Sequence, residues 1–235
     1  MLENCLFIAG TDTEVGKTMI SSALIAYWRH FLSHSPLGVI KLMQTGIGDR
    51  QWYEKFCDED TRLVVPLEYE TPVAPPVAAL LEDRDIDLDL VRRSLVELAE
   101  EQEFVIAESL GSLGSPVTDD LVVADLAGRW QIPTVLVVPV KLGSIGQTVG
   151  QVSLARERHV KLQGMILSCG TPDVEAEIEK LSPPATLEKF TKIPVIGTLP
   201  YVKDWGDRQF LANTVASWNL KALLPPKVFE LTTKI

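Results

Sequence analysis

The fold is decided by Gly10-Thr11-Asp12-Thr13-Glu14-Val15-Gly16-Lys17-Thr18, a stretch near the start of the chain. An apolar run, Cys5–Ala9, precedes it and indicates a buried strand, and Met19–Trp28 follows it with the pattern of a helix. A strand, a glycine-containing loop, Gly-Lys-Thr and a helix, in that order, are typical of a phosphate-binding loop. The stretch therefore predicts that the protein binds a nucleoside triphosphate.

A loop of this kind wraps its backbone N–H groups around a polyphosphate, and the helix N-terminus adds partial positive charge. Lys17 is expected to reach the outer phosphates, and Thr18 to offer its hydroxyl to Mg²⁺. The usual pattern has four residues between its glycines, whereas five separate Gly10 from Gly16. The spacing alone therefore also allows an ordinary loop that contains Gly-Lys-Thr. The strand and helix on either side favour the phosphate loop.

Composition and charge limit the classes of protein to consider. The chain has 235 residues, 46% of them hydrophobic and 23% charged, which predicts a single α/β domain over residues 1–235 with a C-terminal extension at about 221–235. Its net charge is −10, from 22 basic and 32 acidic side chains. Such an acidic chain lacks the electrostatic signature of a nucleic-acid-binding protein. A negatively charged substrate must therefore be held by local positive groups.

The three cysteines, Cys5, Cys57 and Cys169, form no C-x-x-C pair and no cluster with histidine. The pattern supports neither a zinc site nor a disulfide, and reduced thiols are typical of the cytoplasm. We expect no signal peptide, because Met1-Leu2-Glu3-Asn4 lacks the basic start and the long apolar stretch of one. No apolar run approaches the roughly 20 residues that span a bilayer. The expected location is therefore the cytoplasm, without a membrane partner.

Short apolar runs alternate with helix-like segments along the chain. The runs are apolar on both faces and rich in aliphatic residues, which is typical of strands in a parallel sheet that helices cover on both sides. We predict a doubly wound, mostly parallel α/β sheet. The predicted strands are Cys5–Ala9, Leu37–Leu42, Phe104–Ala107, Thr134–Val140, Gln163–Leu167 and Val195–Leu199.

Helices are predicted where apolar residues recur at helical spacing. The segments are Met19–Phe31, Leu88–Leu98, Ser144–Arg158 and Gln209–Leu223. Proline-rich stretches indicate loops at 66–76, 182–184 and 225–226, and the tail after Leu224 is expected to extend over the surface.

Polar residues that follow the strands are candidate site residues, because such sheets bind ligands beyond the carboxyl ends of their strands. Lys41 ends the second run and is costly to bury without an anion; a surface lysine is the alternative. Asp49 either solvates its loop or completes a Mg²⁺ shell. Glu108 closes the third run as a Mg²⁺-holding carboxylate would, or caps a helix. The loop at 140–148 enters a helix whose N–H groups either hold a carboxylate or are capped.

Together these residues resemble the dethiobiotin synthetase family. The resemblance extends from about residue 5 to about residue 220, and the family's own phosphate loop has the five-residue spacing seen here. Several motifs in one order are more specific than any one of them. The matching motifs are Gly10–Thr18, Lys41 with Gln44-Thr45-Gly46, Glu108-Ser109-Leu110-Gly111, Val140–Ile145 and Gly197-Thr198-Leu199-Pro200.

The resemblance implies a phosphate-loop NTPase-like fold and an ATP- and Mg²⁺-dependent cyclo-ligase of biotin biosynthesis. Enzymes of the family join CO₂ to 7,8-diaminononanoate and close a cyclic urea. A substrate amine captures CO₂ as a carbamate, the carbamate attacks the γ-phosphate, and the second amine then expels phosphate. The resemblance also implies a homodimer with the substrate site at the interface.

The resemblance implies the following roles for residues of this sequence. Catalytic roles fall to Lys41, Lys17 and Thr13, and the Mg²⁺ ligands to Thr18, Asp49 and Glu108. The substrate is expected to contact Thr45, Gly143, Ser144, Ile145 and Gly146. The nucleotide is expected to contact Glu14, Val15, Gly16, Lys17, Thr18, Met19, Asp49, Glu108, Ser109, Leu110, Gly111, Ser168, Cys169, Pro200, Tyr201 and Val202.

The sequence departs from the family's pattern at several positions. The family's proline after the lysine is Leu42, and loop glycines are replaced by Ser109 and Ser112. If either serine needs a positive φ, it costs on the order of 1 kcal/mol. The asparagine expected to contact the base is Ser168, whose hydroxyl cannot copy an amide's donor and acceptor. The choice of nucleobase is therefore left open by the sequence.

Two other functions remain as alternatives. A phosphate-loop ATPase of the partitioning or cell-division type would act as a switch, but such proteins usually carry an extra lysine early in the loop, where this chain has Thr11, Asp12 and Thr13. A relative that keeps the fold but has lost activity would bind nucleotide only. The departures at Ser109, Ser112 and Ser168 keep this last alternative open.

Overall fold

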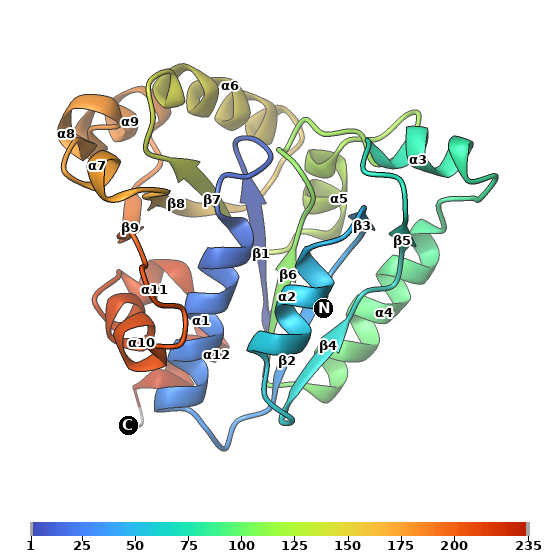
Figure 1. Ribbon diagram of the computed structural model, residues 1–235, viewed down its shortest axis with the longest axis horizontal. Helices are drawn as coiled ribbons and strands as arrows, with labels where there is room; N and C mark the ends of the chain where they lie inside the picture. Colours follow the sequence, from blue (N-terminus) through green and yellow to red (C-terminus); the bar gives the residue numbers. More distant parts are fainter. Residues whose placement is uncertain (1, 234–235) are drawn as a thin grey trace.

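The computed structural model describes residues 2–233, and its centre is a parallel sheet (Figure 1). Seven strands lie in the order β4-β2-β6-β1-β7-β8-β9, and every neighbouring pair is parallel. This confirms the predicted fold class. The strands are β1 (Cys5–Gly10), β2 (Leu37–Lys41), β4 (Thr61–Val64), β6 (Phe104–Glu108), β7 (Thr134–Pro139), β8 (Leu162–Ser168) and β9 (Val195–Leu199); β3 (Gln44–Thr45) and β5 (Glu68–Tyr69) form a small second sheet.

Helices cover both faces of the sheet. One face is covered by α1 (Lys17–Phe31), α2 (Asp49–Phe56), α10 (Arg208–Ala216), α11 (Leu220–Leu223) and α12 (Pro226–Thr232). The other is covered by α4 (Leu88–Glu101), α5 (Val123–Trp130), α6 (Ser144–Glu157) and α9 (Pro184–Thr191). The remaining short helices are α3 (Pro75–Leu81), α7 (Pro172–Glu175) and α8 (Ile178–Leu181). Within residues 2–233 no helix combines the length and the apolar character needed to cross a membrane.

The alternation of side chains along β1 explains this layered arrangement. Leu6 and Ile8 belong to the core on the α1 side, whereas Cys5, Phe7 and Ala9 belong to the core on the α4 side. All five are fully buried. A strand that is apolar at every position is stable only between two layers of helices. The loop that follows β1 begins at the carboxyl end of this strand and leads into α1, one of the helices that cover the sheet.

The six predicted strands are all present, with ends shifted by at most one residue. The edge strand β4 was not predicted, because its exposed Arg62 interrupts the apolar pattern. The helix predicted at Gln209–Leu223 is two helices, α10 and α11, separated by the turn at 217–219. The loop predictions at 66–76, 182–184 and 225–226 were wrong in part, because Pro75, Pro184 and Pro226 begin helices. Proline is well suited to the first turn of a helix, where its missing N–H costs nothing.

The C-terminal segment contributes to the core. We predicted a C-terminal extension at about 221–235, with the tail after Leu224 lying over the surface. Instead, Leu223, Leu224 and Val228 are buried on the α1 side of the sheet. Residues 234–235 of the predicted extension lie outside the described residues.

Candidate active site

The loop between β1 and α1 has the backbone of a phosphate cradle. Glu14 has a φ of 55° and Gly16 a φ of 93°, both in the left-handed region. A Cβ atom at position 16 would lie 2.4 Å from the Ser168 hydroxyl oxygen, so this position requires glycine. The two left-handed residues turn the chain into the first turn of α1. There the N–H groups have no partner within the helix and are free to bind an anion.

Lys17 is the first residue of α1 and is buried, with 7% of its surface exposed. Its Nζ donates hydrogen bonds to the carbonyl oxygens of Asp12 (3.1 Å) and Gly111 (2.7 Å). Burial lowers the pKa of Lys17 to about 8, and the nearby charge of Lys41 adds to this effect. The ammonium therefore lacks a counter-ion that would fully offset its burial. A terminal phosphate is an anion suited to this position.

Nucleotide binding at pH 8.5 is expected to take up most of one proton per site, because a group with a pKa near 8 is mostly neutral there and a bound phosphate restores its charge. Uptake should fade as the pH falls below 8, where Lys17 is already protonated. Calorimetry in buffers of different ionisation enthalpy measures the uptake. The Lys17→Gln variant is the control, and equal uptake by this variant would contradict the assignment to Lys17.

Glu108 is a fully buried carboxylate at the end of β6. It accepts hydrogen bonds from the hydroxyls of Thr18 (3.0 Å), Ser21 (2.9 Å) and Tyr53, and from the Lys41 ammonium (2.7 Å). Four donors offset the cost of burying the charge. Glu108 therefore does not cap a helix, and that alternative was wrong. The pKa of Tyr53 is raised well above its usual value, since burial and the neighbouring Glu108 charge both disfavour the phenolate.

Lys41 ends β2 directly opposite Glu108 in the register of the sheet. It is 3% exposed, so the alternative of a surface lysine was wrong. Its Nζ lies 2.5 Å from Asp49 Oδ2 and 2.7 Å from Glu108 Oε1. Burial lowers the pKa of Lys41, but the two carboxylates raise it by more, and the net shift is upward. Lys41 therefore stays protonated and lies buried at the base of the site.

Asp49 is the first residue of α2 and faces the phosphate loop. Its Oδ1 accepts a hydrogen bond from the Thr18 hydroxyl (3.0 Å). Burial raises the pKa of Asp49, but the charge and hydrogen bond of Lys41, the hydrogen bond from Thr18 and the charge of Lys17 together outweigh it, and the net shift is downward. One hydroxyl and two carboxylates, Asp49 and Glu108, thus converge. This donor set suits Mg²⁺, which takes few carboxylates and fills its octahedron with water and phosphate oxygens. Residues 2–233 contain no group of three or more histidine, cysteine or acidic side chains arranged for a metal.

The convergent residues line a cleft of about 740 Å³. It lies at the carboxyl ends of the strands, since residues of the loop between β1 and α1 line it; Figure 1 shows β1 leading through this loop into α1. Twelve of the predicted site residues line it: Thr13, Glu14, Gly16, Lys17, Thr18, Met19, Lys41, Thr45, Asp49, Glu108, Leu110 and Gly111.

A second cavity of about 240 Å³ continues from the cleft, and Glu14, Gly16 and Met19 line both. The position beside the phosphate loop suits a nucleobase and ribose. Trp205, which the sequence did not indicate, also lines this cavity. The predicted residues found only here are Val15, Ser168, Cys169, Pro200, Tyr201 and Val202.

Other predicted residues do not line the cleft. The turn at 143–146 lines neither cavity. Ser144 is itself buried, and its N–H donates to the Lys141 carbonyl oxygen (3.2 Å). The Ser109 side chain faces a small apolar cavity, and its hydroxyl has no hydrogen-bond partner among the described residues. Neither Ser109 nor Ser112 has a positive φ, so replacing glycine at these positions costs no backbone strain.

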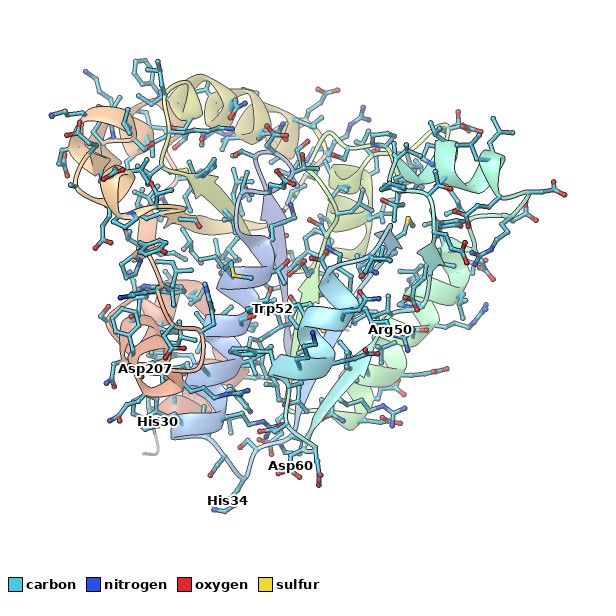
Figure 2. The ribbon with its side chains drawn as sticks, in the orientation of Figure 1. His30, His34, Arg50, Trp52, Asp60 and Asp207 are labelled. Carbon is cyan, nitrogen blue, oxygen red and sulfur yellow. The ribbon has the colours of Figure 1, made fainter. Side chains whose placement is uncertain are left out.

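Several residues of the site were missed by the sequence analysis. Ser21 lies one helical turn after Thr18, and this spacing could have identified it. Tyr53 and Trp52 are on α2, where no sequence signal marked them. Figure 2 places Trp52 between α1 and α2, where its indole N–H donates to the Ser22 hydroxyl (2.8 Å). Its ring meets the ring of Trp205 edge to face at 5.8 Å, so the two cavities share an aromatic wall.

A parallel sheet, a glycine loop leading into Lys17-Thr18, and a buried carboxylate at the end of the adjacent strand define a phosphate-loop NTPase. A ParA family ATPase from Chlorobium tepidum TLS has a similar fold, with a TM-score of 0.54 and 12% identity; the match covers 98% of this chain and 97% of that one. A family model described as an AAA domain matches residues 4–209.

Curated relatives identify the family within this class. An ATP-dependent dethiobiotin synthetase BioD from Crocosphaera subtropica is 53% identical over 93% of this chain and 98% of its own length. The protein of the same name from Gloeothece citriformis is 46% identical over 94% of this chain and 98% of its own length. The chain belongs to the ATP-dependent dethiobiotin synthetase family.

Proposed function

We propose that the protein is a cyclo-ligase that uses ATP to convert 7,8-diaminononanoate and CO₂ into dethiobiotin. The observation that carries the proposal is the identity of 53% with a dethiobiotin synthetase over nearly the full length of both chains. The cleft described above supplies the charged groups that this reaction needs. The partitioning-type switch has only the fold similarity in its favour.

Two lysines would stabilise the charge that develops during the reaction. One substrate amine forms a bond to CO₂ and loses a proton, which gives a carbamate. A carbamate oxygen then attacks the γ-phosphorus, and the bond to the β-phosphate oxygen breaks to release ADP. We propose that Lys17 and Lys41 neutralise the negative charge shared by these groups, as fixed charges in a buried site.

The second step closes the ring. The other amine attacks the carbonyl carbon, loses its proton to solvent and expels phosphate. Holding both amines beside the mixed anhydride is mainly a proximity effect, worth several kcal/mol. We propose that Thr45 contacts the amine or carbamate end of the substrate and that Thr13 contacts the transferred phosphate. Both residues line the cleft.

We propose that Thr18, Asp49 and Glu108 hold Mg²⁺, on the basis of their convergent oxygen atoms. Thr18 Oγ1 lies 3.0 Å from one oxygen of each carboxylate. When bound, the ion would neutralise charge on the outer phosphates. Ser21 and Tyr53 hold the other oxygen of Glu108 and so fix the direction of that carboxylate.

Incubation with diaminononanoate, bicarbonate, Mg²⁺ and ATP tests the proposed function. We expect dethiobiotin and phosphate in equal amounts. Phosphate release that does not depend on the diamine would instead favour the switch. Nucleotide binding without any turnover would favour a relative that has lost its activity.

The nucleobase cavity is expected to discriminate weakly between purine nucleotides. None of its lining residues, all within 2–233, is asparagine or glutamine, and Ser168 stands where the family resemblance predicts asparagine. We therefore expect kcat/KM for ATP to exceed that for GTP by less than about tenfold. The Ser168→Asn variant should raise this ratio by about tenfold, since an amide pairs with a base edge. The exposed Ser217→Asn substitution is the control, and a ratio unchanged by Ser168→Asn would contradict the prediction.

We propose that two copies of the chain form a homodimer that completes the substrate site. The turn at 143–146 presents the N-terminus of α6, which suits a carboxylate, yet it does not line the cleft of its own chain. Leu142, next to this turn, is 87% exposed, and Ile47 at the rim of the cleft is 89% exposed. Large exposed apolar side chains mark interfaces when they gather beside a site. The N–H groups of one copy would thus hold the substrate carboxylate in the cleft of the other.

The Leu142→Asp variant is expected to be a monomer with KM for diaminononanoate raised at least tenfold, because a buried charge disfavours an apolar interface. Sedimentation velocity and steady-state kinetics measure the two effects. Phe210→Asp, which changes an exposed apolar residue on α10, should leave both unchanged. A Leu142→Asp dimer with unaltered KM would rule out this interface.

We further propose that the chain works as one domain in the cytoplasm. The two core clusters lie on opposite faces of the same sheet, and both include residues of β1, β6 and β7. All three cysteines are unpaired, as reduced thiols would be.

A further inference from the structure

Another large cavity lies at the amino ends of the strands, at the end of the sheet opposite the phosphate loop. Its volume is about 720 Å³, close to that of the catalytic cleft. Glu3 precedes β1, Pro133 precedes β7, and Gln163 is the second residue of β8, so the cavity opens at the amino ends of the strands. A six-residue strand such as β1 rises about 3.3 Å per residue, which places the cavity roughly 20 Å from the phosphate loop. It is therefore separate from the nucleotide site.

Positive charge dominates the lining of this cavity. Four cationic side chains come from four separate segments: Arg92 on α4, Arg129 on α5, Lys161 before β8 and Lys227 on α12. The single carboxylate, Glu3, lies 2.8 Å from the Lys227 ammonium. Arg92, Arg129 and Lys161 have no acidic side chain within 4.0 Å among residues 2–233.

This concentration of charge is unlike the rest of the molecule. The chain as a whole carries a net charge of −10, whereas the lining of this cavity carries four cations and one anion. Unpaired like charges that converge on one cavity repel each other, and a bound anion removes that repulsion. Two of the four are arginines, whose planar guanidinium groups match carboxylates and phosphates in a paired geometry.

Apolar side chains complete the lining, namely Leu2, Val96, Trp130 and Pro133. The Trp130 ring offers a flat surface for a ring system or an aliphatic chain, and its N–H is a hydrogen-bond donor. Gln131 and Gln163 add amide groups. The lining thus combines cations with a flat apolar surface, which inorganic phosphate alone would not use.

We propose that this cavity binds a small organic polyanion, with at least two phosphate, carboxylate or sulfonate groups and a flat or aliphatic body. The anionic groups pair with Arg92, Arg129 and Lys161, and the body lies against Trp130. The site is independent of the nucleotide site and of the reaction proposed above.

Pyranine, a pyrene that carries three sulfonates and fluoresces, is a suitable probe. Its fluorescence anisotropy is measured at about 100 mM salt with the full chain, Mg²⁺ and a saturating non-hydrolysable ATP analogue that occupies the phosphate loop. We expect saturable binding of one pyranine per chain. The Arg129→Glu/Lys161→Glu double variant should weaken binding at least tenfold, and Trp130→Ala at least threefold.

The matched control is the Lys55→Glu/Lys189→Glu double variant. It makes the same change in net charge at exposed lysines that do not line the cavity. This control should bind pyranine within twofold of the parent. Dethiobiotin formation by both double variants reports whether they fold, and if the cavity variant lacks turnover it is replaced by Arg92→Gln, for which weaker binding is also expected. Equal weakening in the two double variants, or no saturable pyranine binding while the ATP analogue occupies the phosphate loop, would overturn the proposal.

Discussion

Replacing Lys17 by glutamine is expected to lower kcat for dethiobiotin formation by at least about 10³-fold. The Lys17 ammonium is buried at the start of α1, where the outer phosphates would lie, and glutamine keeps its approximate size without its charge. A fixed charge in a buried site stabilises the transferring phosphate far more than the same charge does in water. A loss of this size corresponds to about 4 kcal/mol of transition-state stabilisation.

The stability of this variant separates a catalytic role from a structural one. Burial lowers the pKa of Lys17 to about 8, which means that the folded protein disfavours its charged form. Removing the charge should therefore leave the melting temperature unchanged or slightly raised below pH 8. Lys180→Gln, at an exposed position on α8, is the control for both measurements. A Lys17→Gln variant with near-normal kcat would remove Lys17 from the mechanism.

The sequence was sufficient to predict the inner strands because each is buried on both faces. Residues such as Val135, Val137 and Leu136 on β7 must all be apolar, since each contacts one of the two layers of helices. The edge strand β4 is under a weaker constraint. Its Arg62 is exposed, so the apolar run is interrupted and the pattern disappears.

The phosphate loop was predictable for a different reason. Gly16 and Lys17 are required locally, by a left-handed backbone and by the phosphates, so their spacing is visible in a short stretch. The contact between Tyr53 and Glu108 has no such signal, because the two residues are 55 positions apart and meet only when α2 lies over β6. The contact between the rings of Trp52 and Trp205 also has no signal in the sequence. Contacts of this kind depend on the packing of helices on the sheet, which a single sequence does not display.

Replacing Glu108 by glutamine is the other substitution with a large expected effect. Glutamine has nearly the same shape but no charge, and it offers one oxygen where the carboxylate offers two. Since Thr18 Oγ1 lies 3.0 Å from Glu108 Oε1, the loss falls on the proposed Mg²⁺ site. We expect kcat at saturating Mg²⁺ to fall by about 10²-fold and the Mg²⁺ concentration for half-maximal activity to rise at least tenfold.

The effect on folding should be smaller than the effect on turnover. Lys41 keeps Asp49 as a partner at 2.5 Å, so the substitution does not strand a buried cation. We expect a loss of about 1–2 kcal/mol of unfolding free energy, which denaturant titration measures. Asp125→Asn is the matched control, because Asp125 is a largely buried carboxylate that accepts from the Val122 N–H and pairs with Arg158 away from the cleft. It should lose similar stability while turnover and Mg²⁺ dependence stay as in the parent. If Glu108→Gln and Asp125→Asn instead lose activity to the same extent, the buried carboxylate at the end of β6 holds the fold together and takes no part in binding the metal.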